Sequence, residues 1–143
     1  MNAIEYLDQA YRLDQHINSK LQQVENLRSL TERVTAVYGG EVVSRTRNPW
    51  SLQDAIGRVM EAEEELNREI DKLVDLKIEI ANVISEVHNE TYRLILEKRY
   101  LGFLSWNRIA SDLNISRRWV LVQHERAVGV VEKLLLKKGM HQQ

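Results

Sequence analysis

The residues of this 143-residue chain best suited to chemistry are two adjacent arginines, Arg117 and Arg118, in the stretch "SWNRIASDLNISRRWV" (105–120). A guanidinium group can donate two hydrogen bonds to O6 and N7 of guanine, or bind a phosphate. Cations are slightly unfavourable at a helix N-terminus, so stability alone does not account for two of them there. The pair therefore predicts contact with a nucleic acid. The alternative is a solvated helix start in a helical bundle.

The residues around this pair predict two short helices joined by a tight turn. Ser105 and Ser116 are good N-caps, because a serine oxygen accepts hydrogen bonds from the unpaired N–H groups at a helix start. Asn114 suits the turn, since asparagine tolerates left-handed backbone angles better than most residues do. Ala110 is small enough to let the two helices pack closely, as a helix-turn-helix requires. The second helix is therefore predicted to begin near Arg117 and to enter the major groove of DNA.

Helical periodicity divides this second helix into an inner and an outer face. Val120, His124 and Ala127 are predicted to face inward, with His124 partly buried and holding one hydrogen bond. Glutamine can pair with adenine, valine can contact the thymine methyl group, and other basic residues can hold phosphates. The tryptophans are expected to pack within the protein and not to stack on bases. The predicted DNA-binding residues are Arg117, Arg118, Leu121, Val122, Gln123, Arg108, Arg126 and Lys133.

Residues 96–134, "LEKRYLGFLSWNRIASDLNISRRWVLVQHERAVGVVEKL", resemble region 4 of bacterial sigma factors. The matching positions are Gly102, Ser105, Ile109, Ala110, Leu113, Ile115, Ser116, Val120, Arg126 and Ala127. With its opening "EYLDQAYRLDQHINSKLQQVENLRSL", the whole chain resembles sigma-region-4-like proteins of uncharacterised role in phages and prophages of Gram-positive bacteria. It is also similar in layout to phage late transcriptional regulators of the RinA and ArpU type.

The resemblance implies sequence-specific binding of duplex DNA, with base contacts from Arg117, Arg118 and Val122. It adds RNA polymerase as a candidate partner and places the protein in the cytoplasm of a bacterial host cell. No other sigma region is recognisable in the chain, so a complete sigma factor is not expected.

The N-terminal half predicts a long antiparallel coiled-coil hairpin over residues 1–89, with a linker at 39–50. Apolar residues recur at helical spacing from Ala3 to Tyr38, and Ser51 is the expected N-cap of the second helix. An unbroken column seven residues apart runs along that second helix and predicts helix-on-helix packing. Because two helices make a thin core, this column is predicted to mediate self-association. Its members are Leu52, Val59, Leu66, Leu73, Ile80 and Val87.

Composition supports an all-α fold and divides the chain by charge. Only 6 glycines and 1 proline occur, which disfavours a β-rich fold with many turns. Residues 1–90 carry a net charge of -7 and residues 91–143 a net charge of +6, as expected if the C-terminal half faces a polyanion. Cysteine is absent, which excludes disulfides and suits a reducing cytoplasm. Neither a signal peptide nor a membrane span is expected, so no membrane partner is predicted.

Catalysis, a metal and a cofactor are not expected. The acidic run at 61–65 lies within the heptads and is expected to be solvated or ion-paired. The four histidines are scattered, without ligand spacing.

The resulting prediction is an all-α transcriptional regulator, with an oligomerising hairpin over 1–89 and a DNA-binding helix-turn-helix over 90–143. Two alternatives remain open. One is a phage small terminase-like protein for DNA packaging, which also combines a helix-turn-helix with an oligomerisation region. The other is a protein-interaction module that does not bind DNA and contacts RNA polymerase.

Overall fold

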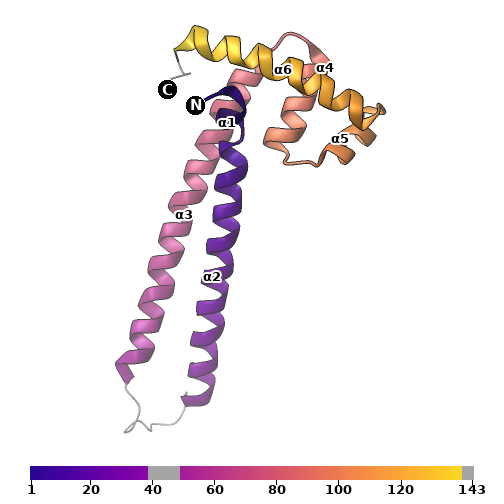
Figure 1. The fold of residues 1–143 in the computed structure, drawn as a ribbon. Coiled ribbons are helices and arrows are strands. Elements are labelled where there is room, and N and C mark those ends of the chain that lie inside the picture. The colour runs from indigo at the N-terminus through magenta and orange to yellow at the C-terminus, as the bar shows by residue number, and fades with distance from the viewer. Residues whose placement is uncertain (39–48, 140–143) are drawn as a thin grey trace. The chain divides into compact units, whose positions relative to one another are not determined.

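The computed structural model describes residues 1–38 and 49–139. Every regular element in these ranges is a helix, and no strand occurs among them, so the all-α prediction is confirmed (Figure 1). In chain order the elements are α1 (Ala3–Leu7), α2 (Gln9–Tyr38), α3 (Pro49–Ser85), α4 (Glu90–Leu96), the π-helical η1 (Glu97–Leu101), α5 (Trp106–Leu113) and α6 (Arg117–Lys138). Within the described ranges, no helix combines the length and the apolar character needed to cross a membrane.

The chain divides into two compact units. One consists of Met1–Leu13 with Leu73–Gln143, and the other of Asp14–Lys72. The predicted division between residues 89 and 90 does not coincide with this boundary. The last turns of α3 belong with the C-terminal helices, because they share a hydrophobic core with them.

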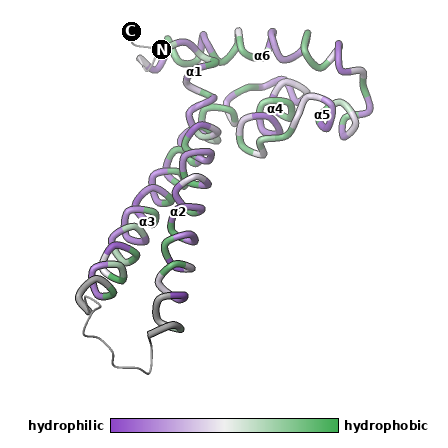
Figure 2. The backbone as a smooth tube through the Cα atoms, turned by 60° about the horizontal axis from the view of Figure 1, so that its bottom comes forward, coloured by the Kyte–Doolittle hydropathy of each residue, from purple (hydrophilic) through white to green (hydrophobic). Residues whose placement is uncertain are grey.

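In the unit Asp14–Lys72, α2 and α3 run side by side in opposite directions (Figure 1). Lys20 Nζ lies 2.8 Å from Glu65 Oε1, and Arg28 forms a second ion pair with Glu63. Glu63 stands where the apolar spacing of α3 would place a hydrophobic residue. At this position it joins α3 to α2 by its ion pair with Arg28. The buried apolar residues here are Ile17, Val24, Val59 and Leu66. Figure 2 shows the underlying alternation of hydrophobic and hydrophilic residues along these helices.

The unit Met1–Leu13 with Leu73–Gln143 has its own core, to which α1, α2, α3, α4, η1 and α6 contribute. Its buried members are Ala3, Tyr6, Leu7, Ala10, Ile80, Val83, Ile84, Val87, Leu96, Tyr100, Ala127, Val131 and Leu135. Polar contacts reinforce it, since Tyr6 Oη donates to Glu79 Oε2 at 2.8 Å and Ala3 N–H donates to Glu132 Oε1 at 2.9 Å. The packing of α1 on α6 thus fixes the N-terminus against the last helix.

Several helix boundaries differ from the sequence prediction. The first predicted helix is divided at Asp8 into α1 and α2. The α3 helix begins at Pro49, so Ser51 lies inside the helix and does not cap it. Proline suits the first turn of a helix, because the N–H that it lacks would have no partner there. The rest of the predicted linker, residues 39–48, lies outside the described residues.

Candidate nucleic-acid interface

The connection between α5 and α6 has the local geometry that the sequence predicts. The hydroxyl of Ser105 accepts a hydrogen bond from Arg108 N–H at the start of α5. Asn114 ends α5 in the left-handed conformation, with φ 58° and ψ 44°. Ser116 then caps α6 by accepting from Trp119 N–H at 3.0 Å. The chain therefore turns within three residues, and α6 begins at Arg117.

A small core under this turn fixes α5 against α6. Ile109 and Ala110 of α5, Val120 of α6 and Ile95 of α4 form a buried cluster. Ile115, the residue inside the turn, packs against the same cluster. Because the turn is anchored on both sides, the first residues of α6 are held in a defined position at the protein surface.

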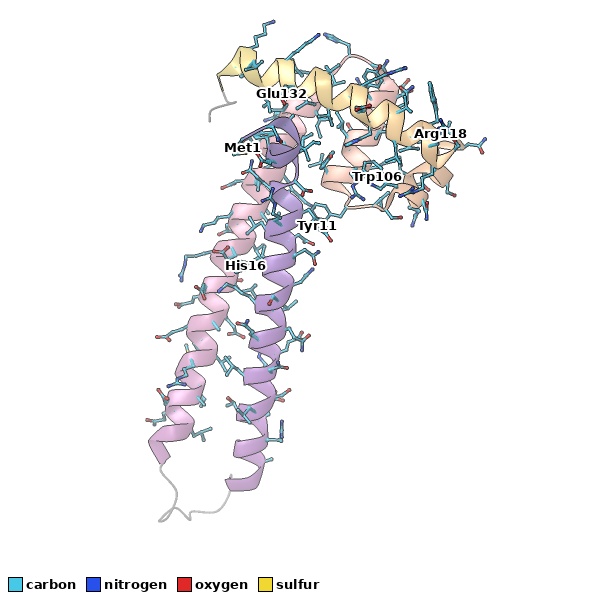
Figure 3. The ribbon with its side chains drawn as sticks, viewed as in Figure 1. Met1, Tyr11, His16, Trp106, Arg118 and Glu132 are labelled. Carbon is cyan, nitrogen blue, oxygen red and sulfur yellow. The ribbon has the colours of Figure 1, made fainter. Side chains whose placement is uncertain are left out.

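Arg117 and Arg118 are exposed on the first turn of α6, and the side chain of Arg118 projects from that end of the helix (Figure 3). The other arginines of residues 90–139 each have a contact within the protein. Arg93 and Arg99 donate to backbone oxygens, Arg108 pairs with a carboxylate, and Arg126 lies over an aromatic ring. In this described range, Arg117 and Arg118 are the two arginines with no hydrogen bond, ion pair or ring contact.

The outer face of α6 agrees only in part with the prediction. Leu121 and Val122 are half-buried, so part of each side chain reaches the surface. Gln123 is only 8% exposed, and its predicted place at the flank of the outer face is wrong. With 3.6 residues per turn, position 123 falls on the same side as the buried Val120 and Ala127. Its amide is therefore not presented to a base.

The three residues predicted to hold phosphates are all exposed. Arg108 Nε lies 3.2 Å from Asp112 Oδ1, and Lys98 Nζ lies 3.6 Å from the other oxygen of that carboxylate. A phosphate bound by Arg108 would therefore lie close to the negatively charged carboxylate of Asp112. Arg126 and Lys133 follow at one-heptad spacing along α6.

Trp119 and Trp106 have different surroundings. Trp106 packs against the small core, with the guanidinium of Arg99 4.2 Å from its ring centroid. Trp119 is 44% exposed, so the expectation that it packs within the protein is wrong. The Arg126 guanidinium lies 5.6 Å from the centroid of the Trp119 ring. Trp119 and Arg126 are seven residues apart, which is about two helical turns and places both on the same side of α6. This spacing could have predicted their contact from the sequence.

His124 supports α6 from the inside, as predicted. Its Nε2 shares a hydrogen bond of 2.6 Å with Tyr100 Oη, and its ring packs T-shaped against Trp106 with 4.6 Å between the ring centroids. Burial, and then the positive charge of Arg99, lowers the pKa of His124 to about 4. Burial also raises the pKa of Tyr100 to about 12. Both side chains are therefore neutral at pH 7, and they belong to the protein interior and not to the basic surface.

The column predicted to mediate self-association faces the chain's own interior. Val59, Leu66, Ile80 and Val87 are buried, and Leu52 and Leu73 are half-buried. The prediction that this column pairs with a second copy is therefore corrected. In a helical hairpin, the most regular apolar row of one helix packs against the other helix of the hairpin, because the two belong to the same chain and are always close together.

The acidic run of α3 takes part in ion pairs. Lys20 holds the pKa of Glu65 below its ordinary value through a hydrogen bond and its charge. Among the described residues, no group of three or more histidine, aspartate or glutamate side chains could hold a metal ion.

Comparisons with known proteins give a family match. No curated protein sequence and no solved structure matches the chain. One family, described as "Protein of unknown function (DUF1492)", matches residues 41–132, a stretch that contains α3, α4, α5 and most of α6. Its description mentions neither sigma factors nor phage regulators of the RinA or ArpU type. Because the match covers more than half of the chain, this protein belongs to the DUF1492 family.

Proposed function

We propose that this protein binds specific sequences of double-stranded DNA with the exposed face of α6 and regulates transcription. The observation that carries the proposal is the pair Arg117 and Arg118, which is exposed at the anchored start of α6 and has no partner among the described residues. In DNA-binding helix-turn-helix proteins, the N-terminal residues of the second helix contact base edges. Two unpaired guanidinium groups at that place fit guanine or phosphate.

The rest of the face provides contacts of several kinds. The exposed parts of Leu121 and Val122 can touch thymine methyl groups. Glu125 is exposed one turn further on and can accept a hydrogen bond from cytosine N4. Trp119, Arg126 and Lys133 lie along one flank of α6 and can contact the sugar–phosphate backbone. Gln123 has no part in this surface, because it is buried.

Charge and resemblance add support. Residues 91–143 carry a net charge of +6, which favours electrostatic capture of a polyanion. The resemblance of residues 96–134 to sigma region 4 points to DNA and RNA polymerase as partners of this part of the chain. It also points to a phage or prophage regulator that acts in the bacterial cytoplasm.

The test begins with selection of bound duplexes from genomic fragments by the full-length protein, followed by fluorescence anisotropy across a salt series. We expect one enriched motif and affinity that falls with rising salt. Arg117→Ala with Arg118→Ala should weaken binding to that motif at least tenfold, since each bidentate base contact contributes about 1–3 kcal/mol of discrimination. The matched control is Arg12→Ala with Arg58→Ala, because both arginines are exposed but already pair with aspartates.

Two results would overturn the proposal. One is the absence of salt-dependent duplex binding. The other is an equal loss of binding in the two double variants, which would show that the position of the charge does not matter. A solution mass of a ring of many subunits would favour the packaging alternative over transcription.

A further inference from the structure

Gly129 is an exposed glycine in the middle of α6, on the face that begins with Arg118. At about 100° per residue, it lies within about 20° of both Arg118 and Val122 around the helix axis. A Cβ added at Gly129 would meet no atom within 4 Å among the described residues, apart from its chain neighbours and the backbone of its own helix. The packing of the described chain therefore leaves room for a side chain at this position.

The glycine lowers the stability of α6, and nothing in the described fold requires it. Glycine is less favourable than alanine in the exposed interior of a helix. Gly129 has ordinary helical backbone, unlike Gly139, which ends α6 with a φ of 71°. A glycine that neither a turn nor internal packing requires is typical of a place where another molecule approaches the backbone closely.

Two cations flank Gly129 on one side. Arg126 lies three residues before it and Lys133 four residues after it. Both side chains are exposed, and both fall about 40–60° to the same side of Gly129 around the axis. They are about 10 Å apart along the helix. This side of α6 therefore attracts a chain of anions, such as the phosphates of a DNA strand.

The carboxylates of the same face lie on the opposite side. Glu125 and Glu132 fall about 40–60° from Gly129 in the other direction. Glu132 accepts a hydrogen bond from Ala3 N–H at 2.9 Å, so it is engaged within the protein. Glu125 stays exposed, and a carboxylate there repels phosphates but can accept a hydrogen bond from cytosine N4. The two charged sides thus distinguish a side for phosphates from a side for base edges.

The length of α6 determines where it leaves the major groove. Base contacts come from the N-terminal residues of such a helix, and the major groove is about 12 Å wide. Gly129 follows Arg118 by eleven residues, or about 16 Å along the axis, so it lies beyond the groove when Arg118 contacts bases. We propose that α6 crosses a phosphodiester strand of the bound duplex at Gly129, with Arg126 and Lys133 holding its phosphates. This inference rests on the proposed function and adds that the missing side chain lets the helix backbone lie against the strand.

Substitution of Gly129 tests the inference, because stability and affinity should change in opposite directions. Gly129→Ala should raise the denaturant midpoint of the full-length protein, since alanine is the better helix former. The same change should weaken binding to the duplex selected from genomic fragments about tenfold by fluorescence anisotropy, roughly the loss of one hydrogen bond to a charged group. Gly129→Leu should weaken binding further. Circular dichroism should show the helical content of the wild type in both variants.

Gly57→Ala is the matched control. Gly57 also lies inside a helix, and a Cβ there meets nothing within 4 Å among the described residues, subject to the same exceptions. Its neighbours three and four residues away are Gln53, Asp54, Met60 and Glu61, so no cation flanks it. Gly57→Ala should raise the denaturant midpoint and leave the affinity for DNA unchanged.

An unrelated duplex and a salt series identify the contact as a phosphate contact. Gly129→Ala should weaken binding to the unrelated duplex as much as binding to the selected one, because every sequence has the same phosphates. Gly129→Leu and Lys133→Ala should each lower the slope of log affinity against log salt by about 0.9, the value for one phosphate.

Three results would overturn the inference while the proposed function stands. The first is wild-type affinity in Gly129→Ala and Gly129→Leu. The second is a loss confined to the selected duplex, which would mean that Gly129 lies at a base. The third is a changed solution mass of Gly129→Leu without DNA, which would assign the glycine to contact with a second copy. A wild type that binds no duplex would refute the proposed function and this inference together.

Discussion

Arg117 and Arg118 contribute little to the stability of the fold that holds them. Each guanidinium lies at the positive end of the α6 dipole and has no carboxylate within reach among the described residues. An exposed arginine keeps its full hydration and its freedom of rotation. It loses part of both when it binds an anionic ligand, and the attraction between the two charges offsets that loss. The two side chains are therefore better explained by a partner outside the chain than by folding.

At the same scale, His124 should make stability depend on pH. Its pKa is lowered from 6.5 to about 4 in the folded protein, so the unfolded chain binds the proton more tightly. The free energy of unfolding should therefore fall as pH decreases from about 6.5 towards 4, by about 1–2 kcal/mol at pH 5 after allowance for partial solvent screening. Urea unfolding at pH 7 and pH 5 measures this change.

His124→Gln is the control for that measurement, because an amide can still bond to Tyr100 but does not titrate. The variant should lose most of the difference between pH 7 and pH 5. If it retains the whole difference, other groups are responsible for it.

At the scale of single elements, the two turns around α5 both use left-handed backbone at a residue other than glycine. Asn114 has φ 58°, and so does Phe103 in the turn that precedes α5. The ring of Phe103 meets Tyr11 edge-on at 5.5 Å, with Lys77 Nζ 4.6 Å from its centroid. A bulky residue in this conformation is strained, and these ring contacts offset the strain. The two turns thus fix both ends of α5.

Substitution of Asn114 should show this backbone requirement. Asn114→Ala should destabilise the protein by about 1 kcal/mol, because a Cβ without the local hydrogen bonding of asparagine disfavours positive φ. Asn114→Gly should be neutral or slightly stabilising, since glycine adopts this conformation freely. Denaturant midpoints compare the two variants. Equal destabilisation by alanine and glycine would mean that the asparagine side chain, and not its backbone angle, matters.

At the scale of the whole molecule, the core of the unit Met1–Leu13 with Leu73–Gln143 draws no buried residue from the described part of Asp14–Lys72. Replacement of Asp14–Lys72 by a turn of about four residues, a usual length between antiparallel helices, should leave this core intact. We expect cooperative thermal unfolding by circular dichroism, because every buried member of this core is retained. Loss of cooperative unfolding would mean that the long hairpin is needed for the core.

The sequence by itself was sufficient for features that depend on a few neighbouring residues. The caps at Ser105 and Ser116 and the left-handed Asn114 follow from side-chain hydrogen bonding and backbone sterics within three or four residues. The all-α class followed from apolar spacing and from the scarcity of glycine and proline. The partly buried state of His124 followed from its place on the inner face of α6.

Only the tertiary structure decided which apolar or polar face meets which neighbour. A heptad column has the same pattern whether it packs on its own chain or on a second copy, and the structure turns Val59 and Leu66 inward. Gln123 lies at the edge of the inner face, where a small rotation of α6 decides between burial and exposure, and the packing of Val120 and Ala127 set that rotation. Periodicity predicts on which side of a helix each residue lies. Which element packs against that side depends on contacts between residues distant in sequence.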